Sequence, residues 1–422
     1  MHFNYHFYKK IFICVLTICS IYAQGQQTMT ATEFLGTANN EPVVKLLQEK
    51  IKYQITTDHS LPVIKELELR TEFDDFNWAD QEYTLRAEFN TKRQRKAQNE
   101  FHSYSSSVNS LTQQVEIKKA MTNRYEWLVK WLEITQALEA KSKLKSLYQD
   151  QLTYLNRTVG DIDFDVQDLV KAEEEVLSIS YDILRLQNQK NRLKAGLYVF
   201  ANGLDSVSIQ RAEVISNEQI IRVLGIGNLD TTMRSDLAKL DGRLYLLEKE
   251  KEVELSETSN PLKFAQIKVN DYEHGWFNEY VSIGLSFKLP LRGEKKLDLN
   301  DLEFEKIEKL GEFEMLKNKL ETEQTKLETR IKQLIEQKKY LQTQQENSQA
   351  KYVLEQLLKL EDAKPLDILK LKEILTKRNQ LIERLDFDIL MQYVQWLDVS
   401  DKMMESPRRN HLLVTPELIF RN

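Results

Sequence analysis

The sequence contains very little cysteine: two residues in 422, Cys14 and Cys19, both within the first 23 residues. This segment has two lysines and no acid, and its apolar run extends from residue 11 to residue 21. The pattern predicts a secretory signal peptide over residues 1–23, cleaved after Ala23; a first buried helix is the alternative. The exported chain would contain no cysteine, which excludes a disulfide framework.

Long hydrophobic runs, excess positive charge and clustered histidines are also missing. After residue 23 no stretch approaches the roughly 18 apolar residues of a membrane-spanning helix. The formal net charge is −6, which argues against nucleic acid as a partner. Six histidines are scattered without metal-ligand spacing, and no phosphate-binding loop or nucleophile motif occurs. The sequence therefore predicts no enzyme, cofactor or metal site.

Glycine and proline are scarce, with 12 and 7 residues, whereas Leu, Glu, Lys and Gln are abundant, a composition that favours long helices. The two longest predicted helices cover residues 92–157 and 298–360, and about 65 helical residues extend for about 100 Å. Apolar residues recur every seven positions in the second helix, which is typical of a coiled-coil seam: Phe313, Leu320, Leu327, Leu334 and Leu341.

Four short segments instead alternate apolar and polar residues with the period of a β-strand. They cover residues 64–74, 82–90, 262–272 and 280–289. The clearest is YVSIGLSFKLPL, which begins at Tyr280. A simple coiled coil has no need of such strands, so they indicate a different architecture.

The order of elements occurs twice, which indicates an internal duplication. Corresponding residues are separated by 197 to 199 positions, as in the pairs Trp78 and Trp276, Tyr83 and Tyr280, and Asp168 and Asp367. We predict a first repeat over residues 24–210, with helices at about 30–58, 92–157 and 166–203. The second repeat covers residues 211–405, with helices at 217–257, 298–360 and 365–404, and an irregular tail occupies 406–422.

Four strands cannot close a barrel that encloses a channel, and open sheet edges are unfavourable in lipid. Three copies of the chain would supply twelve strands, enough for an outer-membrane barrel with a water-filled interior. The alternative is a soluble sheet that packs against its own helices.

The barrel interpretation assigns the strand residues to three environments. The candidate lipid-facing residues are Leu67, Leu69, Phe73, Leu85, Phe89, Val281, Ile283, Leu285 and Phe287. The candidate lumen residues are Glu66, Glu68, Arg70, Glu72, Arg86, Glu88 and Lys288. The candidate membrane-interface aromatics are Trp78, Tyr83, Trp276 and Tyr280, for which packing within the turns is the alternative.

From about Thr30 to Met404 the chain resembles the TolC-like outer membrane efflux proteins, also called outer membrane factors. The motifs that resemble the family are YVSIGLSFKLPL before a charged helix, the opening TATEFL with the later NNEP, Val159-Gly160 before Asp165-Val166-Gln167, and Asp367-Ile368-Leu369. Two features depart from the family. The second turn, residues 359–365, lacks glycine, and the first-repeat strand EYTLRAEFN lacks the Pro-Leu exit.

The resemblance implies a mainly α fold with a small β part. A trimeric twelve-stranded outer-membrane β-barrel would be continued by a periplasmic α-helical barrel. The chain would be a passive export duct of a tripartite efflux pump or type I secretion system in a Gram-negative cell. It would be gated at its periplasmic tip, where a periplasmic adaptor (membrane fusion) protein docks and connects it to an inner-membrane transporter. The residues implied in docking are Val159, Gly160, Val166, Gln167, Asp367, Ile368 and Leu369.

Acidic residues cluster at the two predicted helical turns, and rings of carboxylates in a pore favour cations. The candidate gate residues are Asp161, Asp163, Asp165, Glu361 and Asp362. Helix capping is the alternative role, and it is the better explanation for Asp163 or Asp165. The alternative function for the whole chain is a periplasmic coiled-coil structural or adaptor protein.

Overall fold

The computed structural model describes residues 28–73, 81–162, 164–200, 206–226, 234–258, 261–271, 281–287, 295–360 and 363–419. The predicted signal peptide lies outside these residues. The chain divides into two compact units. We call the first, residues 1–41, 117–229 and 322–422, the helical unit, and the second, residues 42–116 and 230–321, the sheet unit.

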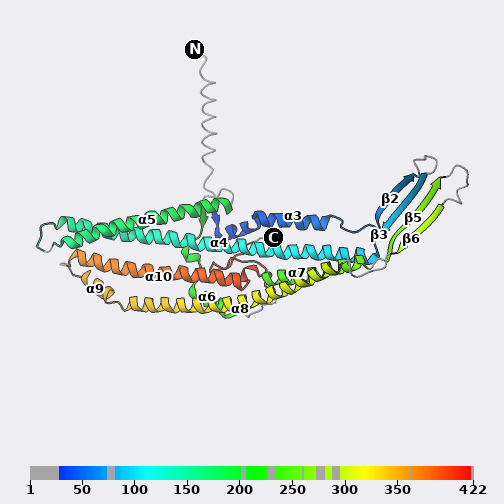
Figure 1. Cartoon of the computed structure of the whole chain (residues 1–422). Helices are drawn as coiled ribbons and strands as arrows, with labels where there is room; N and C mark the ends of the chain where they lie inside the picture. Colours follow the sequence, from blue (N-terminus) through cyan, green and yellow to red (C-terminus); the bar gives the residue numbers. More distant parts are fainter. Residues whose placement is uncertain are drawn as a thin grey trace, which may run out of the picture. The chain divides into compact units, whose positions relative to one another are not determined.

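The sheet unit contains an antiparallel sheet of four strands in the order β2-β3-β5-β6 (Figure 1). The strands are β2 (Ile64–Phe73), β3 (Gln81–Phe89), β5 (Leu262–Asp271) and β6 (Val281–Phe287). Its other elements are α3 (Pro42–Thr56), α7 (Ser235–Thr258) and the first parts of α4 (Lys92–Arg157) and α8 (Lys296–Glu346). Two hairpins from distant parts of the sequence therefore join through the β3–β5 pair.

The strand register places the apolar positions on one face of the sheet. Across the sheet, Leu69 pairs with Leu85, Leu85 with Ile267, and Ile267 with Ile283. Successive side chains point to opposite faces of a strand, so the polar residues between them share the other face. The sheet consequently has one apolar and one charged face.

The helical unit contains the remaining parts of α4 and α8 together with α5 and α10 (Figure 1). The elements that lie wholly in this unit are β1 (Thr28–Thr30), α2 (Ala31–Gly36), η1 (Thr37–Asn40), α5 (Val166–Phe200), β4 (Ser206–Ser208), η2 (Arg211–Glu213), α6 (Asn217–Ile226), α9 (Gln349–Leu357), α10 (Pro365–Val399) and η4 (Lys402–Met404). Strands β1 and β4 form a separate parallel pair. The core of this unit is rich in aromatic side chains, and Phe34, Tyr125, Tyr393 and Trp396 are fully buried.

The C-terminal tail has little regular structure after η4 but packs tightly in the helical unit. Leu412 and Asn410 are fully buried. The Leu412 carbonyl accepts a hydrogen bond from the backbone N–H of Ile215 at 2.8 Å, and the Tyr125 hydroxyl donates to the carbonyl of Arg409 at 3.2 Å. The tail thereby ties the segment before α6 to the middle of α4.

Three predicted helices are interrupted. Residues 30–58 form α2, η1 and α3, and the helix expected at 217–257 is described as α6 and α7. The helix expected at 298–360 forms α8 and α9, because Ser348 adopts an extended backbone (φ −73, ψ 127) and begins α9. Ser348 is buried, and its hydroxyl accepts a hydrogen bond from Arg378 of α10. This contact stabilises a break that the heptad pattern does not reveal.

The coiled-coil seam of α8 is buried or half-buried where it passes through the helical unit. Ile331 is fully buried, and Leu334 is 3% exposed. No helix in the described part of the chain combines the length and the apolar character needed to cross a membrane.

Candidate functional site: the sheet and the helical turns

The apolar face of the sheet is exposed. Ile283 is 78% exposed, Leu69 is 69% exposed and Phe287 is 65% exposed. Other exposed apolar residues on the four strands include Leu67, Leu85, Ile267, Val281 and Leu285. A contiguous apolar surface of this kind marks contact with a partner or a membrane, because soluble proteins rarely leave one exposed.

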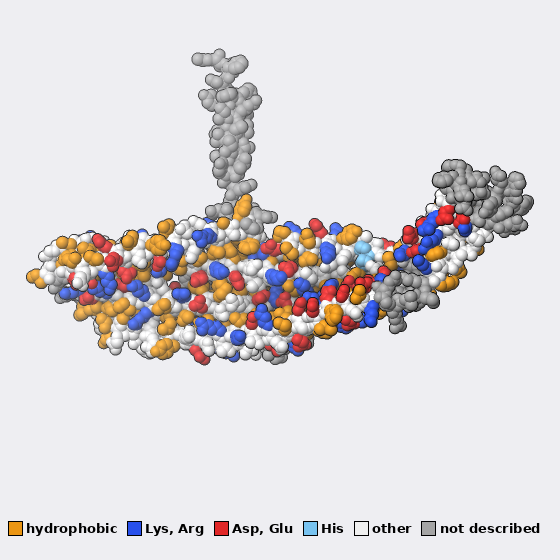
Figure 2. All heavy atoms as spheres, in the orientation of Figure 1, with side chains coloured by type: hydrophobic (Ala, Val, Ile, Leu, Met, Phe, Trp, Pro, Cys, Tyr) orange, Lys and Arg blue, Asp and Glu red, His pale blue; other side chains and the backbone are white. Residues whose placement is uncertain are grey.

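The opposite face carries charged side chains, and blue and red spheres lie together on the sheet in Figure 2; several of these side chains form ion pairs. The Arg86 guanidinium lies 3.3 Å from the carboxylate of Glu88 and 3.8 Å from that of Glu68, and Arg70 lies 2.7 Å from Glu68. Arg86 also stacks over the ring of Phe264, 3.6 Å from its centroid. The arrangement keeps charged side chains along a face that can line water.

The two outer strands of the described sheet each have one open edge, since β2 pairs only with β3 and β6 only with β5. An exposed edge strand presents unpaired backbone N–H and C=O groups and is a template for another strand. Both edges are therefore available for pairing with further copies of the chain.

Several predicted sheet residues are not part of the described structure. Trp78, Trp276, Tyr280 and Lys288 lie outside the described residues. Phe73 is the last residue of β2, but its side chain lies outside the described part. Tyr83 is described and is 38% exposed on the same face as Leu85.

The turn between α4 and α5 contains one position that requires glycine. Gly160 has φ +95, a conformation that side-chain-bearing residues rarely adopt. Three apolar residues around it are exposed: Val159 and Val166 at 60% each and Ile162 fully. The turn therefore presents an exposed apolar surface.

The predicted acidic cluster is only partly visible at these turns. Asp161 is exposed. The carboxylate of Asp165 accepts a hydrogen bond from the backbone N–H of Gln167 at 2.8 Å, so Asp165 has the capping role given above as the alternative. Asp163, Glu361 and Asp362 lie outside the described residues.

The second turn, between α9 and α10, begins α10 with proline at its first position. Leu358 and Leu360 before it are 58% and 61% exposed. Of the predicted docking residues, Asp367 is exposed, whereas Ile368 and Leu369 are half-buried in the first turn of α10.

Ion pairs that were not predicted connect α5 to α10. Lys370 lies 2.8 Å from Asp168, and Lys377 lies 3.8 Å from Glu175. The acids are seven residues apart on one helix and the lysines seven apart on the other, which is the charge pattern of paired helices. This spacing could have revealed the contact. Each exposed pair stabilises the helices by only about 0–1 kcal/mol.

A more buried network lies beside these pairs. The Glu373 carboxylate accepts hydrogen bonds from the Tyr148 hydroxyl at 2.7 Å and the Gln151 amide at 3.2 Å, and Lys377 lies 2.9 Å away. Burial alone would raise the pKa of Glu373, but these donors together lower it. Burial and the bond to Glu373 raise the pKa of Tyr148. The network holds α10 against α4.

This network predicts an acid-sensitive α4–α10 contact. A carboxyl whose pKa is lowered by folding contributes stability above its unfolded pKa of about 4.3, and that contribution is lost as the pH falls further. We expect the melting temperature to decrease more steeply below pH 4.3 in the native protein than in Glu373→Gln. Circular dichroism melts over pH 3–7 measure this difference, and parallel curves would contradict the prediction.

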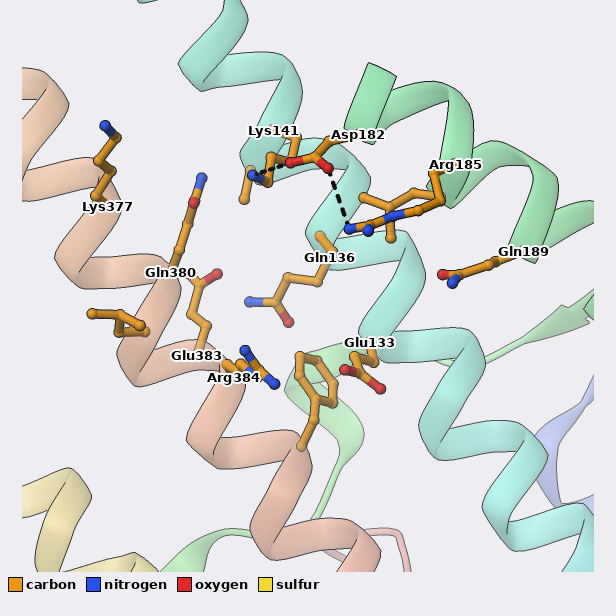
Figure 3. Close-up of a pocket in the computed structure, with 15 residues that line it drawn as sticks. Glu133, Gln136, Lys141, Asp182, Arg185, Gln189, Lys377, Gln380, Glu383 and Arg384 are labelled. Atoms are coloured by element: carbon orange, nitrogen blue, oxygen red, sulfur yellow. Dashed lines mark hydrogen bonds and ion pairs between the residues drawn. The ribbon is translucent and has the colours of Figure 1, made fainter. Parts of the chain in front are cut away.

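A cavity of about 750 Å³ lies between α4, α5 and α10 (Figure 3). On one side Asp182 accepts from Lys141 at 2.7 Å and lies 3.2 Å from Arg185. Burial and the nearby Asp388 raise the pKa of Glu133, which also lines the cavity. Among the described residues no group of three or more His, Cys, Asp or Glu side chains is placed to hold a metal ion.

No protein-family model matches the sequence, and no curated protein matches it. Solved structures do match the fold. The outer membrane protein VceC from Vibrio cholerae is 11% identical, with a TM-score of 0.62 over 88% of this chain and 95% of that one. The Neisseria gonorrhoeae MtrE outer membrane channel in its open state is 10% identical, with a TM-score of 0.63 over 88% of each chain.

The Campylobacter jejuni CmeC outer membrane channel is 10% identical, with a TM-score of 0.61 over 92% of this chain and 87% of that one. At these identities the likeness establishes the fold. The chain therefore has the fold of the TolC-like outer membrane channels, and the mainly α fold with a small β part expected from the resemblance is confirmed. MtrE and CmeC are outer membrane channels.

Proposed function

We propose that this chain is the subunit of an outer-membrane export channel, a passive duct of a tripartite efflux pump or type I secretion system. The observation that carries the proposal is the open sheet of the sheet unit. One face exposes Leu69 and Ile283, and the other carries the Arg86 ion-pair network. Apolar and charged residues alternate in this way in barrels that separate lipid from a water-filled lumen.

The barrel would be a homotrimer, because four strands per chain give twelve in three copies. Antiparallel pairing can continue from β6 of one subunit to β2 of the next, since both edges are open. The candidate lipid-facing and lumen residues lie on opposite faces of the sheet wherever their side chains are described. The repeats at 24–210 and 211–405 would each provide one hairpin of the barrel.

A periplasmic adaptor would dock at the helical turns and couple the channel to an inner-membrane transporter. Support comes from the exposed apolar residues Val159, Ile162 and Val166 of the first turn and Leu358 and Leu360 of the second. Adaptor docking at turns of this kind is implied by the resemblance. Export would begin with cleavage of the signal peptide near Ala23, and most of the protein would lie in the periplasm.

Fractionation and conductance test the proposal together. We expect the mature protein to remain in outer-membrane fractions until detergent is added, to have the mass of a trimer, and to produce ion channels in planar bilayers. A periplasmic coiled-coil or adaptor protein, the alternative function, would be soluble without detergent and would not conduct. That result would overturn the proposal.

The acidic residues at the turns give a further prediction about the pore. Replacing Asp161, Asp163, Glu361 and Asp362 by asparagine would remove four carboxylates from every subunit. If these residues form rings at the constriction, cation-over-anion permeability should decrease toward unity. Reversal potentials in a salt gradient measure it. Asp150→Asn on α4 is the control, and unchanged selectivity in the fourfold variant would contradict the prediction.

A further inference from the structure

Basic side chains gather at one end of the four-stranded sheet. Ile64 pairs with Phe89, and Leu262 pairs with Phe287, so the starts of β2 and β5 lie at the same end as the ends of β3 and β6. Four exposed cations lie at this end or follow it in the sequence: Lys92 and Arg93, three and four residues after Phe89, Lys263, next to Leu262, and Lys296, nine residues after Phe287. We call them the basic rim. None of the four has an ion pair with any residue that the structure describes.

Two neighbouring lysines at this end are already neutralised by acids. Lys65 lies 3.6 Å from Glu88, and Lys295 lies 2.5 Å from Glu254. None of the four residues of the basic rim is neutralised in this way by a described residue.

The opposite end of the sheet has the opposite charge in the sequence. The two connecting segments, residues 74–80 and 272–280, contain five acids and no lysine or arginine. In the sequence, the two segments that connect the paired strands are therefore acidic, whereas the basic rim is cationic.

The start of α4 is held firmly beside the sheet. The backbone N–H of Asn90 donates to the carbonyl of Val63 at 2.9 Å, and its side-chain amide donates to the carbonyl of Pro62 at 2.9 Å. Thr91 and Gln94 then exchange hydrogen bonds that begin the helix. Lys92 follows Phe89 by three residues, so the two backbones are within about 10 Å.

Basic residues are electrostatically unfavourable at this position. The N-terminus of a helix carries a partial positive charge, and the first turn of α4 contains no acid to offset it. Lys92 and Arg93 add positive charge where it is least favourable. An external anion bound at this place would remove that cost.

We propose that the basic rim binds the phosphate groups of anionic phospholipids whose acyl chains cover the apolar face of the sheet. The proposal rests on the proposed function, because it requires the sheet to lie in a membrane. A phospholipid matches the surface in two respects, since the apolar face of the sheet is exposed and its residue Phe287 pairs with Leu262, the neighbour of the unpaired Lys263. Juxtamembrane cations attract anionic headgroups in this way.

The test uses the purified full-length mature protein in detergent with phosphatidylglycerol and phosphatidylcholine in equal amounts. Retained lipid is measured by mass spectrometry after washing. The test variant is Lys92→Gln/Arg93→Gln/Lys263→Gln/Lys296→Gln. The control removes three lysines and one arginine that are also exposed and lack ion pairs with described residues: Lys194→Gln/Lys326→Gln/Arg330→Gln/Lys332→Gln.

We expect the native protein and the control to retain more phosphatidylglycerol than phosphatidylcholine. In the test variant the ratio of retained phosphatidylglycerol to phosphatidylcholine should fall at least about tenfold. The charge-conserving variant Lys92→Arg/Arg93→Lys/Lys263→Arg/Lys296→Arg should keep it, which separates loss of charge from misfolding. A native protein that needs detergent but retains both lipids equally would overturn this inference and leave the proposed function standing. Displacement of the lipid by inorganic phosphate, but not by chloride of equal ionic strength, would also overturn it.

Discussion

Arginine at Ile283 should prevent assembly of the channel in the membrane, whereas arginine at the neighbouring Ser282 should be tolerated. Both residues lie on β6 and both are exposed, but they point to opposite faces of the sheet. An arginine at the lipid midplane of a membrane barrel costs about 2–4 kcal/mol, and a trimer would contain three of them. The same residue at 282 would lie on the charged face beside Lys268 and its partner Glu82.

The comparison separates lipid contact from packing within the chain. Ile283 is 78% exposed, so its replacement removes few contacts within a single subunit. Ile283→Ala therefore serves as a second control and should assemble normally. The measurement is the amount of detergent-extracted trimer in outer-membrane fractions. Equal amounts of trimer from Ile283→Arg and Ser282→Arg would show that this face does not meet lipid.

Removal of the Arg124 guanidinium should strongly destabilise the helical unit. Arg124 is 1% exposed, and it donates to the Thr37 hydroxyl at 2.8 Å, the Ala120 carbonyl at 3.0 Å and the Glu41 carboxylate at 2.9 Å. Breaking a buried ion pair by removing one partner costs about 3–5 kcal/mol. Glu41 remains partly exposed and can be hydrated, so the cost should lie at the lower end of this range. We expect Arg124→Met to lower the free energy of unfolding by about 3 kcal/mol.

Thermal unfolding followed by circular dichroism measures the loss of stability in Arg124→Met. The free energy of unfolding of Arg124→Lys should lie between those of the native protein and Arg124→Met. Lysine keeps the charge but cannot reproduce the planar set of guanidinium N–H donors. Arg192→Met, on the exposed surface of α5, is the control and should change stability by at most about 0.5 kcal/mol. An Arg124→Met protein as stable as this control would contradict the assigned role.

The parts of the fold that depend on local signals could be predicted from the sequence. The alternation in residues 280–289 and the heptads of residues 313–341 identify the strand and the helix, because side-chain spacing repeats with the period of each element. The mainly helical fold with a small sheet follows from these patterns. The apolar and charged faces of the sheet also follow from the alternation alone.

The parts that depend on contacts between distant residues could not be predicted. Arg124 binds residues 83 and 87 positions away, and Tyr125 contacts a tail 284 positions away. The break at Ser348 is stabilised by Arg378 from another helix, which outweighs the local helical pattern. The sequence of the α4–α5 turn does not by itself determine the positive φ of Gly160.

Disulfide trapping between the open edges of the sheet tests the central claim most directly. Two strands lie between β2 and β6 of one chain, and strands are about 4.8 Å apart, so the edges are about 14 Å apart and beyond the reach of a disulfide. The mature chain is predicted to lack cysteine, so Arg70→Cys on β2 can be combined with cysteine at 282, 284 or 286 on β6 and oxidised in the native membrane. The account predicts a covalent trimer from at least one combination, and only monomers from all three would contradict it.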